Sequence, residues 1–213
     1  EMNSIFYRND KFSLVDSGTF WLSPTPEVVG SKFENSNEAR VCTWAHLKDK
    51  KTAKEFVHLN VHLDNPGPST AADATTVRLE QGKVLLDFVK TLGDTPLILT
   101  GDFNQVQQRS TGEVYPLYLY LTGQDSYTDK DGNTVSGPFA DARMTAPDTV
   151  SQTEWASMVK HHRDGGNPAT RPIDYIFYSA EHFEATTYRN ILYMEEDIFT
   201  ISDHLAQYAE LLL

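Results

Sequence analysis

The chain has 213 residues, of which 39% are hydrophobic and 23% are charged, a composition typical of a soluble globular protein. Its 30 acidic residues outnumber its 18 lysines and arginines, and the resulting formal charge of −12 disfavours tight nonspecific binding to nucleic acids. No apolar run approaches the roughly 20 residues of a membrane span, so no membrane insertion is expected. The single cysteine, Cys42, excludes an internal disulfide and a cysteine-based zinc site, and leaves a cytoplasmic or a secreted location open.

The N-terminal third of the chain is predicted to form β-strands. Residues 4–10 and 12–22 are rich in aromatic and β-branched residues and are bounded by turn formers. After a proline-containing loop, residues 40–49 and 55–64 alternate between apolar and polar types, which predicts a hairpin with Cys42 as a buried thiol. One face of the second of these strands is expected to carry Phe56, His58, Asn60 and His62.

The middle of the chain alternates helical and strand patterns. Residues 75–92 have a broadly helical apolar period, and the run PLILTGDFN at 96–104 predicts a buried strand. A short helix is expected within 112–123, because Pro116 suits a first turn and Gly123 suits the position after a helix end. We therefore expect helices and strands in one layered α/β domain.

The remainder of the chain contains a less regular part and further strands. Residues 125–167 are polar and contain glycines, which predicts an irregular insertion that faces the substrate. The pattern indicates strands at 171–179 and near 204–213. Residues 1–213 are thus interpreted as a single α/β domain with mixed sheets.

Polar side chains that can act on a substrate or bind a metal recur where predicted strands begin or end. Each has an ordinary structural interpretation when taken alone: a turn residue, a structural histidine, an edge carboxylate or a turn cap. Several such placements in one small domain favour a common site. The residues concerned are His62 in NVHLD, Asp102 and Asn104 in GDFN, Asp174 in PIDYIFYS, and Asp203 and His204 in ISDHLAQ.

These motifs carry a family resemblance. NVHLD is followed by GDFN, IDYIF and SDHLA in the order found in the endonuclease/exonuclease/phosphatase superfamily, and the chain resembles that superfamily over essentially its whole length. The stretches DSGTFWLS and RVCTWAHL further resemble a branch of small metal-dependent hydrolases. The resemblance implies a DNase I-like four-layer α/β sandwich, with two mixed β-sheets packed face to face and helices outside.

The resemblance also implies a divalent cation, Mg²⁺ or Mn²⁺, held by oxygen ligands. By motif position, Asp102 and Asn104 would orient the attacking water and the phosphate and serve as metal ligands. Asp203 would be a further metal ligand. Asp102 is the preferred activator of the water, although the division of this role between Asp102 and the histidines is left open.

The histidines and their supports follow in the same way. His204 would act as base or contact the phosphate, and His62 would hydrogen-bond the phosphate or act as general acid. Asp174 would orient one histidine, either His62 or His204. Glu1, in EMNSIFYR, resembles a family glutamate that supports the histidine matching His62. Arg40 is left between two interpretations, a phosphate contact and a surface charge.

One part of the family pattern has no match in the chain. Family members begin with a strand that carries an asparagine, followed by a glutamine–glutamate pair whose glutamate is a principal metal ligand. We therefore expect residues 1–213 to be an N-terminally incomplete domain, and a separate N-terminal segment of the same domain to complete the site.

The predicted function is hydrolysis of a phosphate ester, with a phosphodiester favoured. The acidic charge and the lack of a Lys/Arg cluster favour a small-molecule substrate, and a nuclease acting on DNA or RNA is the alternative. A catalytically silent binding or scaffold protein is the alternative from another class.

Overall fold

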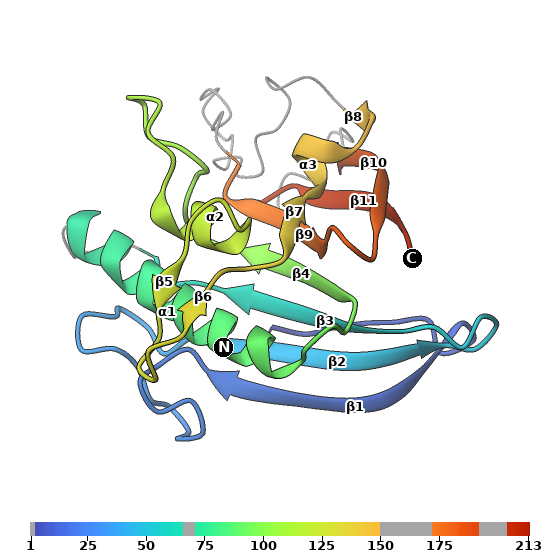
Figure 1. Cartoon of the computed structure of the whole chain (residues 1–213), viewed down its shortest axis with the longest axis horizontal. Coiled ribbons are helices and arrows are strands. Elements are labelled where there is room, and N and C mark those ends of the chain that lie inside the picture. Colours follow the sequence, from blue (N-terminus) through green and yellow to red (C-terminus); the bar gives the residue numbers. More distant parts are fainter. Residues whose placement is uncertain (1–2, 66–70, 150–171, 192–203) are drawn as a thin grey trace, which may run out of the picture.

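The computed structural model describes residues 3–65, 71–149, 172–191 and 204–213. Its main sheet has six strands in the order β1-β2-β3-β4-β9-β7 (Figure 1). Neighbouring strands are antiparallel except for β3 and β4, which are parallel. The strands are β1 (Phe12–Trp21), β2 (Val41–Asp49), β3 (Glu55–His62), β4 (Leu97–Asp102), β9 (Asp174–Ser179) and β7 (Phe139–Asp141).

Two helices cover one face of the main sheet. Parallel strands cannot be joined by a tight turn, so the chain crosses from β3 to β4 through the long helix α1 (Ala71–Thr91). The shorter α2 (Pro116–Leu121) begins at Pro116, where a missing backbone N–H costs nothing, and Gly123 follows its end with φ +68°. Both helices form where the sequence predicts them, although α1 begins four residues earlier than expected.

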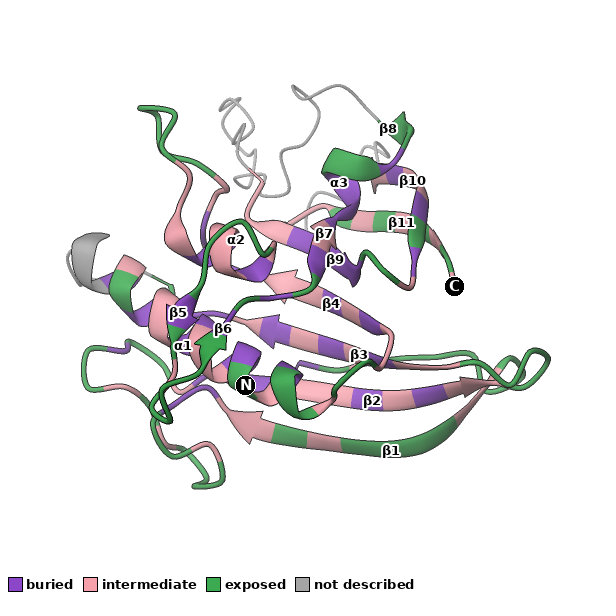
Figure 2. Ribbon diagram, viewed as in Figure 1, coloured by how far each residue is buried: buried purple, intermediate pink, exposed green. Residues whose placement is uncertain are grey.

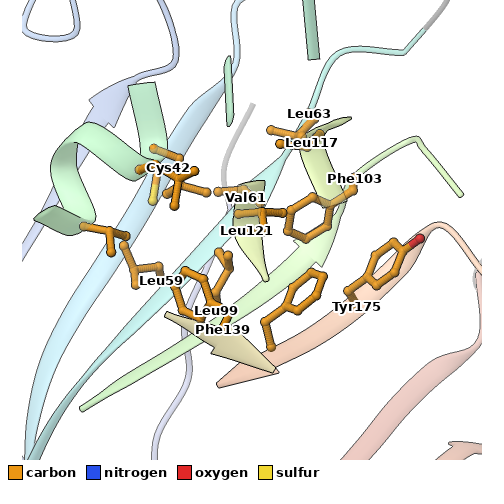
Figure 3. Packing of buried hydrophobic residues seen from close by; sticks show 14 of the residues in the cluster. Cys42, Leu59, Val61, Leu63, Leu99, Phe103, Leu117, Leu121, Phe139 and Tyr175 are labelled. Carbon is orange, nitrogen blue, oxygen red and sulfur yellow. The ribbon is translucent and has the colours of Figure 1, made fainter. Parts of the chain in front are cut away.

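The principal apolar core lies between these helices and the main sheet. From Phe56 onward strand β3 alternates, and Figure 2 shows its buried residues separated by residues of intermediate exposure. Its buried residues face α1 and α2, together with side chains of β4 and β9 (Figure 3). The members with almost no exposure include Leu59, Leu63, Leu85, Leu86, Leu97, Leu99 and Phe177.

A second sheet packs on the opposite face of the main sheet. Its strands are β11 (Ala206–Leu212), β10 (Glu184–Ile191) and β8 (Asp148–Thr149), in that order. Ala185 and Tyr188 of β10 join a second apolar cluster with Phe56, Ile98 and Ile176 of the main sheet. The layers are therefore helices, main sheet and second sheet, and the mixed α/β sandwich predicted from the sequence is confirmed.

The structure corrects two of the expected elements. Residues 4–10, expected as a strand, form none. Instead, the Asn3 side chain donates to the Val41 carbonyl oxygen of β2, and the Asn60 side chain of β3 donates to the Ser4 carbonyl oxygen, so side chain–backbone contacts hold the start of the segment. A ladder needs backbone partners along an edge, and these contacts do not provide one.

The second correction concerns the insertion expected at 125–167. Its described part, up to residue 149, contains the hairpin of β5 (Tyr127–Thr128) and β6 (Thr134–Val135), the short helix α3 (Ala142–Thr145), and strands β7 and β8. These elements have two to four residues each, which is too short for a periodic pattern to show. Residues 150–167 lie outside the described residues.

Two smaller expectations concern membrane spans and the cysteine. Among the described residues, no helix is both long and apolar enough to cross a membrane. The Cys42 side chain is fully buried, and burial raises the pKa of its thiol well above the ordinary range. The predicted buried thiol is confirmed.

Candidate active site

Three adjacent strands place three polar side chains in one row. In the ladder of the main sheet, His62 at the end of β3 is paired with Asp102 at the end of β4, and Asp102 is paired with Asp174 at the start of β9. Residues that are directly paired across strands point to the same face. The row faces away from α1 and α2, because the alternate residues Val61 and Phe103 belong to the helix-side core.

Asp102 is at the centre of this row and has an imidazole on either side. Its Oδ2 lies 3.3 Å from His62 Nε2 and 3.9 Å from His204 Nε2. All three side chains are partly exposed, between 16% and 31%, so a substrate can reach them. A carboxylate between two imidazoles can exchange protons with a bound water.

His204, just before β11, is oriented by Asp174. Its Nδ1 lies 2.8 Å from Asp174 Oδ2, and because a carboxylate accepts, Nδ1 is the nitrogen that carries the proton. The sequence left two possible histidine partners for Asp174, and the structure places it against His204. The second sheet holds this arrangement, since Gln207 of β11 donates to the Asp174 carbonyl oxygen.

The electrostatics of the row centre on two neighbouring carboxylates. Burial, and then the negative charge of Asp174, raise the pKa of Asp102, while the amide of Asn104 and the two histidines oppose the rise. Ligand atoms of Asp102, Asp174 and His204 all lie within 4.8 Å of one another. Converging carboxylates with an imidazole suit a divalent cation, because its charge offsets their repulsion. Among the described residues this is the group that could hold a metal ion.

A tight turn after β4 brings Asn104 to the row. Gly101 has φ +147°, and a Cβ there would lie 1.9 Å from the carbonyl oxygen of Val61, so only glycine fits against β3. Asn104 itself has φ +49°. Its amide donates to Asp102 Oδ1 at 2.7 Å, and its side-chain Nδ2 donates to the Leu63 carbonyl oxygen at 2.9 Å. Asn104 therefore fixes the Asp102 carboxylate and links the ends of β3 and β4.

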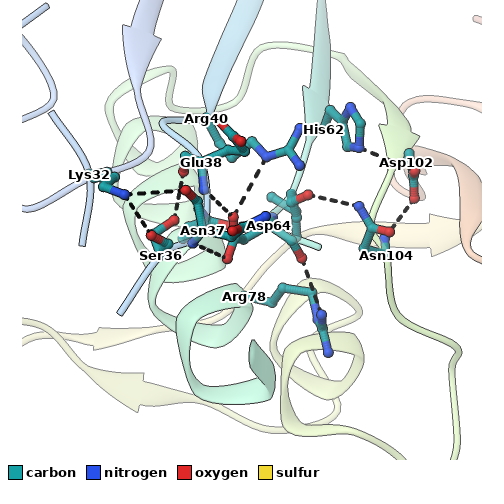
Figure 4. Close-up of polar contacts among 12 residues, drawn as sticks. Lys32, Ser36, Asn37, Glu38, Arg40, His62, Asp64, Arg78, Asp102 and Asn104 are labelled. Atoms are coloured by element: carbon teal, nitrogen blue, oxygen red, sulfur yellow. Dashed lines mark hydrogen bonds and ion pairs between the residues drawn. The ribbon is translucent and has the colours of Figure 1, made fainter. Parts of the chain in front are cut away.

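Behind the row, a buried carboxylate holds the loop that precedes β2. The two oxygens of Asp64 accept from the backbone amides of Asn37 and Glu38, and Arg40 Nε lies 3.8 Å from Oδ1 (Figure 4). Arg78 of α1 donates to the Asp64 carbonyl oxygen. Arg40 is only 5% exposed, so the surface-charge interpretation of this residue is wrong.

A second polar row lies beneath the first on the same face. His58 Nε2 lies 2.9 Å from Thr100 Oγ1, and Thr100 Oγ1 donates to Asn60 Oδ1 at 3.1 Å. Burial lowers the pKa of His58 to about 4, so this imidazole is neutral near pH 7. Sequence reasoning assigned no role to Thr100, although the alternation of β3 had placed His58 and Asn60 on this face.

The structure thus brings together five of the residues singled out in the sequence. They are His62, Asp102, Asn104, Asp174 and His204. Glu1 and Asp203 lie outside the described residues. The sequence analysis assigned no role to Asp64, which anchors the loop before β2. Its position two residues after His62 in the motif NVHLD is the sequence feature that could have indicated a role.

A mixed α/β sandwich with acids, imidazoles and an amide at its strand ends agrees with the fold class expected from the sequence. The chain belongs to the Endonuclease/Exonuclease/phosphatase family, which matches residues 5–204. This assignment confirms the resemblance found in the motifs.

Individual proteins show the same similarity. Nocturnin of Drosophila melanogaster is 28% identical over an alignment of 190 residues, and the match covers 85% of this chain and 26% of that protein. A mannosyl-6-phosphatase of Bacteroides thetaiotaomicron is 28% identical with a TM-score of 0.70, over 97% of this chain and 69% of the other. An endonuclease/exonuclease/phosphatase of Bacteroides vulgatus is 27% identical with a TM-score of 0.73, over 97% and 68%. The chain thus spans about a quarter of nocturnin and about two thirds of the two bacterial structures.

Proposed function

We propose that this protein is a divalent-metal-dependent phosphoesterase that uses an activated water to hydrolyse a phosphate ester. The observation that carries the proposal is the position of Asp102 Oδ2 between His62 Nε2 and His204 Nε2, with Asp174 bound to the far side of His204. Such an arrangement supplies a proton acceptor and imidazole donors within one small volume. Membership of the Endonuclease/Exonuclease/phosphatase family supports the same chemistry.

The residues present fit a divalent cation. The raised pKa of Asp102 reflects burial and the repulsion of Asp174, and a cation among these oxygens would relieve that repulsion. Asp102, which belongs to the group of converging ligand atoms, would hold it, and Asn104 and Asp203 are proposed as further ligands on the basis of their motifs. When bound, Mg²⁺ or Mn²⁺ would neutralise the phosphate charge.

Asp102 is the proposed water activator. The Asn104 amide binds Oδ1, which leaves Oδ2 directed toward the two histidines, where it can accept a proton. A positioned carboxylate of this kind accepts a proton from the water as the water attacks phosphorus.

The histidines are proposed to contact the phosphate and the leaving group. Asp174 holds the proton of His204 on Nδ1, so Nε2 is the nitrogen presented toward the row. As an imidazolium, His204 stabilises the charge that develops on the phosphate, and Asp174 stabilises that cation. His62 donates to the phosphate or protonates the leaving oxygen. Glu1 is proposed to support His62.

The proposed substrate is a small phosphodiester. The formal charge of −12 supports this choice, because long nucleic acids would be repelled at a distance. A phosphomonoesterase is the second candidate, favoured by the similarity to a mannosyl-6-phosphatase. A nuclease and a silent scaffold are the remaining alternatives.

The test is hydrolysis of bis(p-nitrophenyl) phosphate and p-nitrophenyl phosphate by the intact protein, with Mg²⁺ or Mn²⁺ and with EDTA. Asp102→Ala and His204→Ala are compared with Asp94→Asn, a matched control because the Asp94 side chain is 90% exposed and is bound only to His182 among the ion pairs of the described residues. We expect metal-dependent turnover that both site variants lose and the control keeps. The preferred reagent separates the two candidates.

Two outcomes would contradict the proposal. Turnover that survives both site substitutions would place the chemistry elsewhere. A folded protein without turnover on either reagent, and without cleavage of single-stranded DNA or RNA, would favour the scaffold alternative.

A further inference from the structure

A cavity lies on the helix-covered side of the main sheet, away from the row of His62, Asp102 and Asp174. Its volume is about 810 Å³, within the range of small-molecule binding sites. It is bounded by the end of β1, the loop that follows it, the C-terminal half of α1, and residues 127–130 at the β5–β6 hairpin. Trp44, which lines it, is paired in register with Leu59 and so shares the helix-side face. None of the proposed catalytic residues lines this cavity.

The cavity has an aromatic floor. Phe20 and Phe88 are in contact with ring centroids 4.6 Å apart, and Trp44 lies 5.8 Å from Phe88. The three rings are only partly buried, because they pack against the core from its edge. A Cβ at Gly18 would lie 2.8 Å from Trp44 Nε1, so the indole lies across the β1 backbone where only glycine leaves room. The floor is therefore a preformed apolar surface open to a ligand.

Polar groups surround this floor in donor–acceptor pairs. Lys83 Nζ lies 2.6 Å from Glu80 Oε1, and the Tyr127 hydroxyl donates to Asp87 Oδ1 at 2.7 Å. Lys83 also lies over the Tyr127 ring, 5.6 Å from its centroid. Adjacent charged donors and acceptors can bind several hydroxyl groups at once, and hydrogen bonds to charged groups are the stronger ones.

The charge of the lining limits the chemistry of the ligand. Four carboxylates line the cavity against two lysines, Lys83 and Lys130, so a phosphate or nucleic acid is disfavoured. Glu80, Asp87 and Asp129 already bind a lysine or a tyrosine hydroxyl, which reduces their attraction for an added cation. A purely apolar ligand would cover the charged rim without satisfying it.

From these features we infer that the cavity binds a neutral carbohydrate ring. The apolar face of such a ring stacks on Phe20, Trp44 and Phe88, and its hydroxyl groups hydrogen-bond with the Glu80–Lys83 and Asp87–Tyr127 pairs. The site would hold a sugar-bearing molecule at a distance from the row of His62, Asp102 and Asp174. The inference is independent of the proposed function, because it rests on a different face and on different residues.

Tryptophan fluorescence can test the inference directly. Trp21 and Trp44 line the cavity, and a Trp155→Phe background removes the remaining tryptophan. The intact protein is titrated with the methyl glycosides of glucose, mannose, galactose and N-acetylglucosamine and with trisaccharides of each. Benzyltrimethylammonium is the probe for a cation site and inorganic phosphate the probe for an anion site.

We expect a saturable fluorescence change with at least one sugar. Phe88→Leu, which removes a stacking ring, should weaken binding about tenfold, and Glu80→Gln should weaken it independently if the first variant folds poorly. The matched control is Tyr208→Leu, at a 41% exposed aromatic residue on β11, and it should bind like the parent. All variants should retain phosphoesterase turnover, which keeps this test separate from that of the proposed function.

Other results would overturn the inference. A response to the ammonium probe or to phosphate but to no sugar would assign the cavity to a charged ligand. Sugar binding that is unchanged in both cavity variants would place the sugar elsewhere. The absence of a saturable response to every sugar, in a protein with normal turnover, would remove the proposal.

Discussion

The two faces of β3, β4 and β9 are built from alternate residues of the same strands, yet they differ in almost every physical property. On the helix side, Leu59, Leu99 and Phe177 are paired in register and at most 1% exposed. On the other side, the ends of the same strands carry His62, Asp102 and Asp174. The helix-side face supplies hydrophobic free energy along its whole length. The other face packs Phe56, Ile98 and Ile176 against the second sheet, but at the strand ends it holds groups whose burial opposes folding.

The comparison shows how a small domain can carry like charges close together. The pKa of Asp102 is raised because its carboxylate is partly buried beside Asp174, which is an unfavourable environment for a charge. The apolar face of the same strands offsets that cost and keeps the row in place. Groups proposed to serve catalysis and groups that serve stability should therefore respond in opposite ways to substitution.

The largest expected effect is that of Asp102→Asn. Turnover on bis(p-nitrophenyl) phosphate should fall about 100- to 10,000-fold, because a proposed base is lost. The pKa of Asp102 is higher in the folded than in the unfolded protein, so the parent loses stability as the pH rises from the unfolded-state pKa through the folded-state pKa. Asn cannot ionise, so the variant should be as stable as the parent at low pH and more stable at neutral pH. Urea unfolding at several pH values measures this difference. A variant less stable than the parent at neutral pH would contradict the account.

On the apolar face, Leu99→Ala should lower the stability of the fold and leave turnover unchanged. The Leu99 side chain has no exposed surface, so truncation should cost about 2–5 kcal/mol of unfolding free energy. The turnover number of the folded fraction should be unchanged. The control is Leu14→Ala at a 46% exposed position, which should cost less than about 0.5 kcal/mol. Equal losses in the two variants would mean that the helix-side face is not the stabilising one.

The pH dependence of stability tests the lower polar row. Burial lowers the pKa of His58 from 6.5 to about 4, so its neutral form stabilises the fold above pH 6.5, and this contribution is lost as the pH falls toward 4. The loss should amount to at most about 3 kcal/mol. His58→Gln, which can still hydrogen-bond with Thr100, should flatten the curve of unfolding free energy in this interval. An unchanged slope would show that His58 does not titrate in this way.

The smallest expected effect is that of Thr100→Val. The substitution removes the hydroxyl that joins His58 to Asn60 and should cost about 1 kcal/mol in unfolding free energy. Turnover should change by less than about tenfold, because the upper row keeps its own contacts. A loss of turnover as large as that of Asp102→Asn would make the lower row part of the catalytic machinery.

The sequence by itself determined five of the six strands of the main sheet, the helices α1 and α2, and the position of the polar motifs at strand ends. Alternation and helical period are local properties of the sequence. In β3, His58, Asn60 and His62 alternate with leucine and valine, so the sequence of this strand alone predicts a polar and an apolar face. The order of the motifs sufficed for the family, which the match over residues 5–204 confirms. The short strands β7 and β8 were not predicted, because segments of two or three residues are too short to show a hydrophobic period.

Only the tertiary structure decided which groups meet. Register across β3, β4 and β9 puts His62, Asp102 and Asp174 side by side, and packing of the second sheet brings His204 rather than His62 to Asp174. Local patterns predict neither arrangement, because pairings between residues as far apart in the sequence as Asp102 and Asp174 depend on how whole sheets pack. The burial of Arg40 against Asp64 was not predictable for the same reason, because the residues next to Arg40 in the chain do not indicate this distant partner.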